Sequence, residues 1–288
     1  MKSLSIISAA ILLFVFAIGY SSCSKSSSNT PPAPHVQIKT SVAYGNYLVD
    51  KNGNTLYFFT VDVNRASNCA GACEINWPIL ADSNLTAGEL GAGLTLSDFG
   101  TVGTPEGKMQ LTYKGWPLYN FAPGGAQEAV GQISGDGAGN GSFFVAKPDY
   151  TIMLGSDQLV GADGNDYTAP DYVSGSVGPT TYFTDAWGAT LYTFVIDSAN
   201  HNKFTKADFS NNATFPIYDT TGIVVPSTVN KTLFSTTSVF TREQLTYNGY
   251  PLYYFGADSS IRGNTKGVSI GPKKWPVAQT TTPAAPHL

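Results

Sequence analysis

Three cysteines are the residues of this chain best suited to covalent or redox chemistry: Cys23, Cys69 and Cys73. Cys23 follows an apolar N-terminal stretch, whereas three residues separate Cys69 from Cys73. A bond between these two fits an oxidising compartment, where disulfides persist. We interpret the pair as a structural disulfide that closes a short loop. A redox-active pair is the alternative, although thioredoxin-like motifs place only two residues between their cysteines.

Histidine, the commonest acid–base and metal-binding side chain, is almost absent. The chain has three histidines, His35, His201 and His287, and two of them lie near the ends of the predicted folded part. A Ser-His-Asp triad or a histidine-ligated haem would therefore depend on His201 alone. A zinc site needs about four ligands. The sequence predicts no metal and no cofactor, and it favours a non-enzymatic protein while leaving enzymatic activity open.

Three aspartates, each directly after a predicted strand, are further candidates: Asp62, Asp197 and Asp258. In a structural interpretation each carboxylate accepts backbone N–H groups and ends its strand in a turn. In a functional interpretation the carboxylates hold calcium or a cationic ligand, with help from loops such as residues 136–140. Calcium requires about six to eight oxygen ligands, and the chain has no EF-hand spacing. The structural interpretation is therefore favoured.

Aromatic residues recur on the predicted strands, and most of them are expected in the core. Two occupy matching places beside the turns of two predicted hairpins, Trp116 and Tyr250. Such a position can leave a ring exposed. These two residues are our candidates for a platform that stacks on a sugar ring or an aromatic cofactor.

The elements that must position these residues occur twice. Residues 53–62 (GNTLYFFTVD) return as 188–197 (GATLYTFVID), and residues 110–121 (QLTYKGWPLYNF) return as 244–255 (QLTYNGYPLYYF). Matching tyrosines are 135 residues apart in the first block and 134 apart in the second. Two separate blocks with one offset indicate a duplicated unit of about 100 residues.

Turn chemistry predicts that each unit is all-β. In the first unit, an Asn-Gly turn predicts a hairpin over residues 47–59, and a Lys-Gly turn predicts another over residues 110–121. Residues 56–59 are apolar on both faces, so this strand should be covered on both sides. We predict antiparallel hairpins in two tandem units, sandwich-like or as stacked sheets. A few short helices are expected, for example at 86–90 and 241–245.

The N-terminus has the layout of an exported lipoprotein. Lys2 precedes the uncharged apolar residues 4–19, and small residues lead to Cys23. A cysteine at this place resembles a lipobox, which implies that Cys23 is diacylated; Tyr20 stands where the pattern prefers leucine. An ordinary cleaved signal peptide is the alternative. The predicted organisation is a signal peptide at 1–22, lipidated Cys23 with a flexible tether to 40, a first repeat at 41–148, a connector with a hairpin at 149–178, a second repeat at 179–282 and a tail at 283–288.

A recurring motif of tyrosine, aromatic residue and aspartate resembles a family of secreted bacterial repeat lipoproteins with no assigned activity. The pattern is Tyr-x-aromatic-x-x-Asp, and at the fourth expected place Gly124 replaces the acid. The matching residues are Tyr57, Phe59 and Asp62, then Tyr192, Phe194 and Asp197, and finally Tyr253, Phe255 and Asp258. The resemblance implies an exported location and a β-rich fold. It does not imply any particular reaction, since the family has no assigned activity.

The same family has a Cys-x-x-x-Cys pattern followed by Trp-Pro. Cys69, Cys73 and residues 77–78 match it, whereas Phe204 and Asp208 take the two cysteine positions in the second copy. Both cysteines are thus missing together, as expected for partners in one bond.

Composition and address together narrow the function. A net charge of −4 and a charged fraction of 12% give no basic surface for nucleic acid. We predict an envelope lipoprotein held to the membrane by its N-terminal lipid, in the outer membrane if the host is diderm. It would bind or scaffold an envelope protein or a glycan without catalysis. The alternatives are an accessory in extracytoplasmic electron transfer or redox homeostasis, and a carbohydrate-binding or carbohydrate-active protein.

Overall fold

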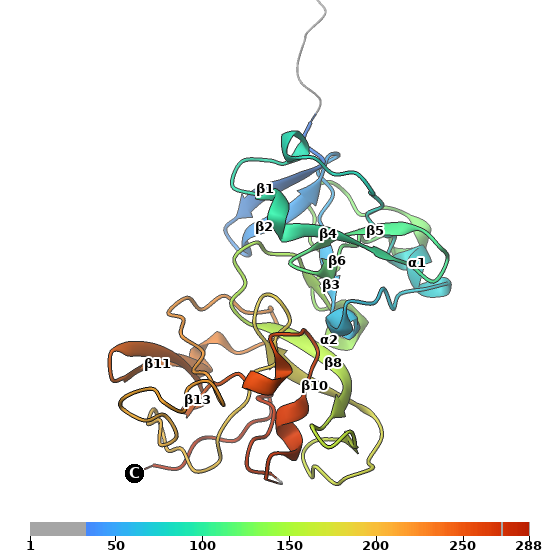
Figure 1. The fold of residues 1–288 in the computed structure, drawn as a ribbon. Helices are drawn as coiled ribbons and strands as arrows, with labels where there is room; N and C mark the ends of the chain where they lie inside the picture. Colours follow the sequence, from blue (N-terminus) through green and yellow to red (C-terminus); the bar gives the residue numbers. More distant parts are fainter. Residues whose placement is uncertain (1–32, 272, 288) are drawn as a thin grey trace, which may run out of the picture. The chain divides into compact units, whose positions relative to one another are not determined.

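The computed structural model describes residues 33–271 and 273–287 of this chain (Figure 1). The predicted signal peptide, Cys23 and most of the predicted tether lie outside the described residues. Within the described part, no helix is both long enough and apolar enough to cross a membrane.

The described residues form short strands joined by turns and single-turn helices. The strands are β1 (Val36–Ser41), β2 (Gly45–Asp50), β3 (Tyr57–Phe59), β4 (Phe99–Gly103), β5 (Met109–Tyr113), β6 (Trp116–Pro117), β7 (Phe143–Val145), β8 (Met153–Val160), β9 (Asp166–Tyr167), β10 (Pro179–Thr184), β11 (Phe234–Val239), β12 (Arg242–Tyr247) and β13 (Tyr250–Pro251). The helices are α1 (Ala72–Asn76) and α2 (Ala138–Gly141), with 3-10 turns η1 (Thr60–Asn64), η2 (Ala87–Glu89), η3 (Leu96–Asp98), η4 (Pro123–Gly125), η5 (Lys231–Leu233), η6 (Gly256–Asp258) and η7 (Lys266–Ser269). The predicted all-β class is confirmed.

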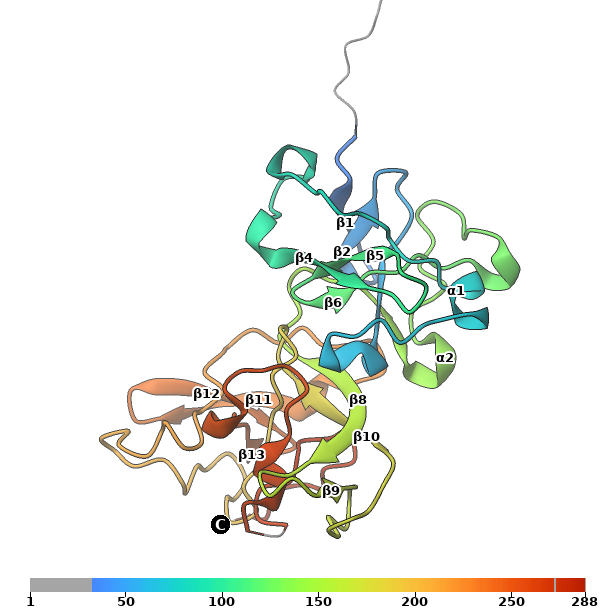
Figure 2. The ribbon, with the colours of Figure 1, turned by 45° about the vertical axis from the view of Figure 1, so that its right-hand side comes forward.

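The strands pair antiparallel in several small sheets. The orders are β1-β2, β3-β7, β4-β5-β6, β10-β8-β9 and β11-β12-β13. The sheet β4-β5-β6 has the same order as β11-β12-β13, and β1-β2 has a counterpart in the pair of β8 and β10 (Figure 2). At the centre of each repeat two tyrosines face each other in an antiparallel bridge, Tyr57 with Tyr119 and Tyr192 with Tyr253.

Two segments belong to the fold although the sequence places them outside the repeats. β1 begins at the fully buried Val36, inside the segment predicted to be a flexible tether. β8 pairs with β10 along six residues, so part of the predicted connector supplies a strand to the second repeat. The connector also contains a hairpin, as predicted, because β8 pairs with β9. The strand partners of β1 and β8 lie outside the duplicated blocks from which the boundaries were read.

The described part of the predicted tail, residues 283–287, is also docked. Ala285 is buried, and its amide donates to the Asn248 carbonyl at 2.9 Å. The Ala199 amide donates to the carbonyl of Pro286 at 2.8 Å. The C-terminal segment therefore packs on the β12–β13 turn.

Local predictions had mixed outcomes. The hairpin at 110–121 is confirmed by the pairing of Tyr113 with Trp116 around a turn whose Lys114 and Gly115 have φ of 49° and 78°. The short helix predicted at 86–90 is confirmed as η2. The helix predicted at 241–245 is wrong, since these residues enter β12, whose alternating side chains pair with β11.

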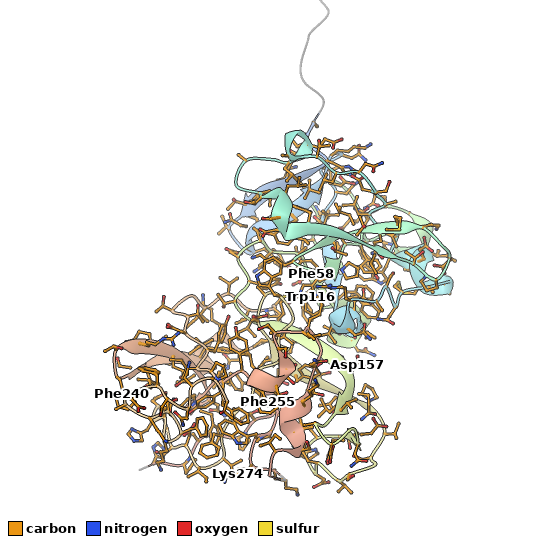
Figure 3. The ribbon with its side chains drawn as sticks, viewed as in Figure 1. Phe58, Trp116, Asp157, Phe240, Phe255 and Lys274 are labelled. Atoms are coloured by element: carbon orange, nitrogen blue, oxygen red, sulfur yellow. A yellow bond between two sulfur atoms is a disulfide. The ribbon has the colours of Figure 1, made fainter. Side chains whose placement is uncertain are left out.

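One arginine of the second repeat joins it to the first. The Arg262 side chain is 7% exposed, and its Nε and Nη1 donate to the carbonyls of Val63 at 2.7 Å and Lys114 at 3.0 Å. Its guanidinium carbon lies 4.4 Å from the ring centroid of Trp116. The Trp116 indole N–H in turn donates to the carbonyl of Ala186 at 3.1 Å. Trp116 therefore lies on the face on which the second repeat docks. Phe58 packs beside it, and Figure 3 labels both residues.

Contacts between β8 and η1 extend this interface. Gly155 of β8 lies so close to Val63 that a Cβ at this position would be 2.6 Å from a Val63 methyl carbon. Asn64 Nδ2 donates to Asp157 Oδ2 at 3.1 Å. The glycine thus permits a close approach that a larger residue would prevent.

Candidate functional site

In the second repeat the two motifs exchange their hydrogen bonds. Tyr192 and Tyr253 lie opposite each other and exchange both backbone hydrogen bonds, at 2.8 and 3.0 Å. The Tyr253 hydroxyl donates to Asp197 Oδ2 at 2.7 Å, and the Tyr192 hydroxyl donates to Asp258 Oδ2 at 2.7 Å. All four side chains are buried. The tyrosine of each motif is thus bound by the acid of the other motif.

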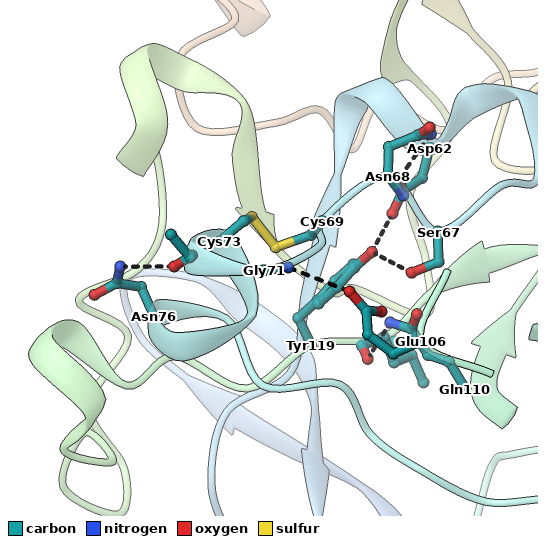
Figure 4. The surroundings of a disulfide bond; sticks show 12 residues. Asp62, Ser67, Asn68, Cys69, Gly71, Cys73, Asn76, Glu106, Gln110 and Tyr119 are labelled. Carbon is teal, nitrogen blue, oxygen red and sulfur yellow. Dashed lines mark hydrogen bonds between the residues drawn. A yellow bond between two sulfur atoms is a disulfide. The ribbon is translucent and has the colours of Figure 1, made fainter. Parts of the chain in front are cut away.

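The first repeat has the same arrangement, with one different acid. The Tyr119 hydroxyl donates to Asp62 Oδ2 at 2.6 Å, as Figure 4 shows. The Tyr57 hydroxyl donates to Glu128 Oε1 at 2.6 Å. Glu128 therefore takes the role of the aspartate that Gly124 replaces, four residues further along. Sequence reasoning missed this residue, because it searched one fixed spacing.

The sequence points to Glu128 once the structure has aligned the two repeats. The Gly135 amide donates to the Tyr57 hydroxyl at 3.3 Å, and the Gly267 amide donates to the Tyr192 hydroxyl at 3.3 Å. Aligning these two glycines places a two-residue insertion before Gly135. Glu128 is the only carboxylic acid between Phe121 and Gly135, so it was the sole available fourth acid.

The second oxygen of each carboxylate also has a partner. Backbone amides donate to Asp62 Oδ1 from Asn68 at 2.8 Å, to Asp197 Oδ1 from Lys203 at 2.7 Å, to Asp258 Oδ1 from Lys266 at 2.9 Å and to Glu128 Oε2 from Ser134 at 3.0 Å. These bonds are the ones that the structural interpretation of the aspartates predicts. In the described part of the chain, no group of three or more His, Cys, Asp or Glu side chains is placed to hold a metal ion.

Burial sets the proton affinity of these acids. It raises the pKa of Asp62, Asp197 and Asp258 from 3.8 to about 6 each, more than the hydrogen bonds from tyrosine and backbone lower it. Burial and the adjacent carboxylate raise the pKa of Tyr119 and Tyr253 far above the usual value. In the pairs of Tyr119 with Asp62 and of Tyr253 with Asp197, the proton therefore stays on the tyrosine.

The aromatic residue of the motif belongs to a stack of three rings. Phe59 stacks on Phe143 at 4.1 Å between centroids, and Phe143 stacks on Trp77 at 3.7 Å. In the second repeat Phe194, Trp275 and Phe215 form the equivalent stack, with 4.3 and 3.5 Å between centroids. Trp and Phe have exchanged places between the two stacks. The volume of the stack is thereby kept, which is the behaviour of a packed core. Phe255, the aromatic residue of the third motif, is buried beside Phe215.

The bond between Cys69 and Cys73 is present (Figure 4), as predicted, and it ties the chain after η1 to α1. Cys69 is 1% exposed. In the second repeat Phe204 stands at the matching position, where its ring packs on Phe215 and Trp275 at 5.6 and 4.9 Å between centroids. A phenyl ring that has no redox chemistry thus fills the equivalent place. This substitution favours the structural interpretation of the disulfide.

Loss of this disulfide should have a modest effect on stability. Replacing Cys69 and Cys73 with serine should lower the free energy of unfolding by about 2 kcal/mol, because the closed loop is short. Urea unfolding of both proteins, and of the wild type with and without reductant, measures the difference. A redox-active pair would instead equilibrate near the thioredoxin potential of about −270 mV.

The two residues proposed as a ligand platform, Trp116 and Tyr250, differ in burial. Trp116 is fully buried, so its assignment to an exposed platform is wrong. The physical reason is the docking of the second repeat, whose Arg262 covers the ring. Tyr250, its counterpart, is half-buried and lines a cavity of about 200 Å³. Only Tyr250 can meet a ligand.

Comparison with known proteins supports the family resemblance over part of the chain. Residues 40–81 match the model of a family described as a secreted repeat of unknown function. This segment contains one copy of the tyrosine–aspartate motif and the disulfide. No curated protein and no solved structure matched the chain. The secreted character of the matched repeat indicates an extracellular or envelope location.

Proposed function

We propose that this protein, which carries a secreted repeat of unknown function, is a lipid-anchored envelope protein that binds or scaffolds a partner without catalysis. The proposed lack of catalysis is supported most strongly by the use of the four buried carboxylates. Each of them accepts a tyrosine hydroxyl on one oxygen and a backbone amide on the other. They therefore stabilise the repeat and are not available to reach a substrate.

The anchor is supported by the N-terminal sequence. Cys23 follows an apolar segment and small residues, and residues 24–34 contain no large apolar side chain. Such a segment suits a tether that holds the folded part away from a membrane surface. Two or three acyl chains would anchor it stably, whereas one would not. In a diderm host we propose an anchor in the outer membrane. An aspartate directly after the lipidated cysteine is associated with retention in the inner membrane, and Ser24 stands at that place.

The anchor has a direct test. Cells that express the chain and are fed an alkyne-labelled fatty acid should yield labelled protein in the membrane fraction. Cys23→Ala should abolish the label and move the protein to the soluble fraction, while Cys69→Ser with Cys73→Ser should keep both label and location. An unlabelled wild-type protein in the soluble fraction would contradict the anchor.

Among the alternatives, a role in redox homeostasis has the weaker support, because Cys69 is buried and Phe204 replaces it in the second repeat. A carbohydrate-binding role has a specific observation in its favour, the cavity beside Tyr250.

A further inference from the structure

The cavity beside Tyr250 lies in the second repeat and is lined in part by the segment that precedes it. Its lining includes the rings of Tyr172 and Tyr250, Thr193, Pro276 and residues 281–283. We propose that it binds one pyranose ring of a glycan. This inference rests on the proposed binding function and specifies its ligand.

The cavity exists because smaller side chains replace three large aromatic ones. Tyr192 bridges Val277 as Tyr57 pairs with Val145, so Thr193 and Pro276 stand at the positions of Phe58 and Phe144. Tyr247 pairs with Tyr250 as Tyr113 pairs with Trp116, so Tyr250 stands at the position of Trp116. In the first repeat these three aromatic side chains are 3%, 0% and 0% exposed. They fill the space that is open in the second repeat.

The cover over this face also differs between the repeats. In the first repeat Arg262 donates to the carbonyl of Lys114 and lies over Trp116. In the second repeat the matching carbonyl belongs to Asn248, and the Ala285 amide donates to it at 2.9 Å. Asn248 Nδ2 donates a hydrogen bond to the carbonyl of Thr282 at 3.0 Å. The C-terminal segment thus takes the place of Arg262 but leaves the space above Tyr250 unfilled.

One buried polar atom in the lining lacks a partner. The Tyr172 side chain is 7% exposed, and its hydroxyl makes no hydrogen bond within the described residues. The backbone amide of Val277 is near enough to offset part of the rise in pKa that burial causes. A buried hydroxyl without a hydrogen bond costs about 1–3 kcal/mol. This hydroxyl oxygen has less than 1 Å² of accessible surface, so the contact that the cavity offers to a ligand does not depend on it.

The remaining chemistry of the lining fits a sugar. Tyrosine and proline rings offer apolar surface to the C–H face of a pyranose, while Thr193, Gln279 and Lys273 offer polar groups to its hydroxyls. The Lys273 ammonium is exposed and lies 3.6 Å from the Asp171 carboxylate, so it can turn toward a ligand. The volume of about 200 Å³ is below the roughly 300–1,000 Å³ of pockets for drug-sized ligands. It suits a single ring.

The test uses the full lipidated chain in a detergent without a sugar headgroup. Titration calorimetry with the methyl pyranosides of glucose, galactose, mannose and N-acetylglucosamine should show binding of at least one. Thr193→Phe restores the ring of the first repeat and should weaken binding about tenfold or more, and so should Tyr250→Ala. Tyr172→Phe removes only the buried hydroxyl and should change the affinity by less than about twofold, since the ligand does not reach that oxygen.

A matched control separates this cavity from the rest of the surface. Trp187 is 49% exposed and lies outside the cavity lining, so Trp187→Ala should leave binding unchanged. Binding that survives both Tyr250→Ala and Thr193→Phe, or that is lost with Trp187→Ala, would overturn the proposal, as would the absence of binding by all four pyranosides. The failure of this inference can be told apart from the failure of the proposed function. If no pyranoside binds, but Cys23 is lipidated and the Thr193→Phe variant still captures a protein partner, the glycan ligand is excluded and the proposed binding function stands.

Discussion

Replacing Arg262 with alanine is expected to lower the free energy of unfolding by about 3 kcal/mol. The guanidinium is buried between the repeats and donates to the carbonyls of Val63 and Lys114. Alanine would leave both carbonyls without these donors and would uncover the ring of Trp116. Relief of the burial of a charge offsets part of the loss, since burial already lowers the pKa of Arg262 to about 10.

Urea unfolding measures this effect against a control of the same residue type. Arg242 lies on the surface, where its Nε contacts Asp219 Oδ2 at 2.7 Å. Exposed ion pairs contribute about 0–1 kcal/mol, so Arg242→Ala should be nearly neutral. Arg262→Met keeps the aliphatic cover over Trp116 and should fall between wild type and Arg262→Ala. Equal unfolding midpoints for Arg262→Ala and Arg242→Ala would show that Arg262 does not join the repeats.

Stability should increase as the pH falls from about 7.5 to about 4.5, opposite to the usual acid destabilisation. Three aspartates, Asp62, Asp197 and Asp258, have a folded-state pKa of about 6 against an ordinary value of 3.8. Between these values the folded state binds protons that the unfolded state has released. The free energy of unfolding therefore decreases as the pH rises through this window, and the loss is complete above pH 6 or so.

Each unit of pKa shift corresponds to about 1.4 kcal/mol. We therefore expect the three sites together to lower the free energy of unfolding by at least about 3 kcal/mol as the pH rises through this window. Exposed carboxyl groups whose pKa is lowered act in the opposite direction, with a small effect because solvent screens them. These groups are Glu89, Asp163 and Asp208.

Urea midpoints across this pH range provide the measurement. Asp197→Asn should remove less than one third of the pH dependence, because Asp197 is one of three sites with a pKa near 6 and burial raises the pKa of Asp185 as well. The control is Asp149→Asn, which changes an exposed carboxylate and should leave the profile as in the wild type. A wild-type protein that becomes more stable as the pH rises from 4.5 to 7.5 would contradict the burial of these charges.

Features held by local contacts could be predicted from the sequence. The Lys114–Gly115 turn sets the hairpin at 110–121 because its residues adopt positive φ, and the duplicated blocks locate the central strands of both repeats. The pairing of tyrosines with acids is not local, since Tyr253 and Asp197 are 56 positions apart. Burial of Trp116 depends on Arg262, which also contacts Lys114 across 148 positions. No local pattern reports such contacts.

The prediction of a cavity would have needed a comparison between the repeats at the level of side-chain volume. Phe58 against Thr193 and Trp116 against Tyr250 are visible in the aligned blocks. Their meaning depends on which face they share, and that follows only from the pairing of β3 with β7. The prediction that Trp116 is exposed was wrong because it treated the two repeats as equivalent. The face of the first repeat that contains Trp116 is covered by Arg262 of the second repeat.

The structural role of the motif carboxylates is tested most directly by carboxyl carbon-13 NMR of the chain during a pH titration, with and without excess calcium. We predict that Asp62, Asp197 and Asp258 titrate near pH 6, that calcium leaves these midpoints unchanged, and that Tyr253→Phe raises the midpoint of Asp197 alone because one hydrogen bond to its carboxylate is lost. Midpoints at the ordinary value of 3.8, or midpoints that calcium displaces, would contradict it.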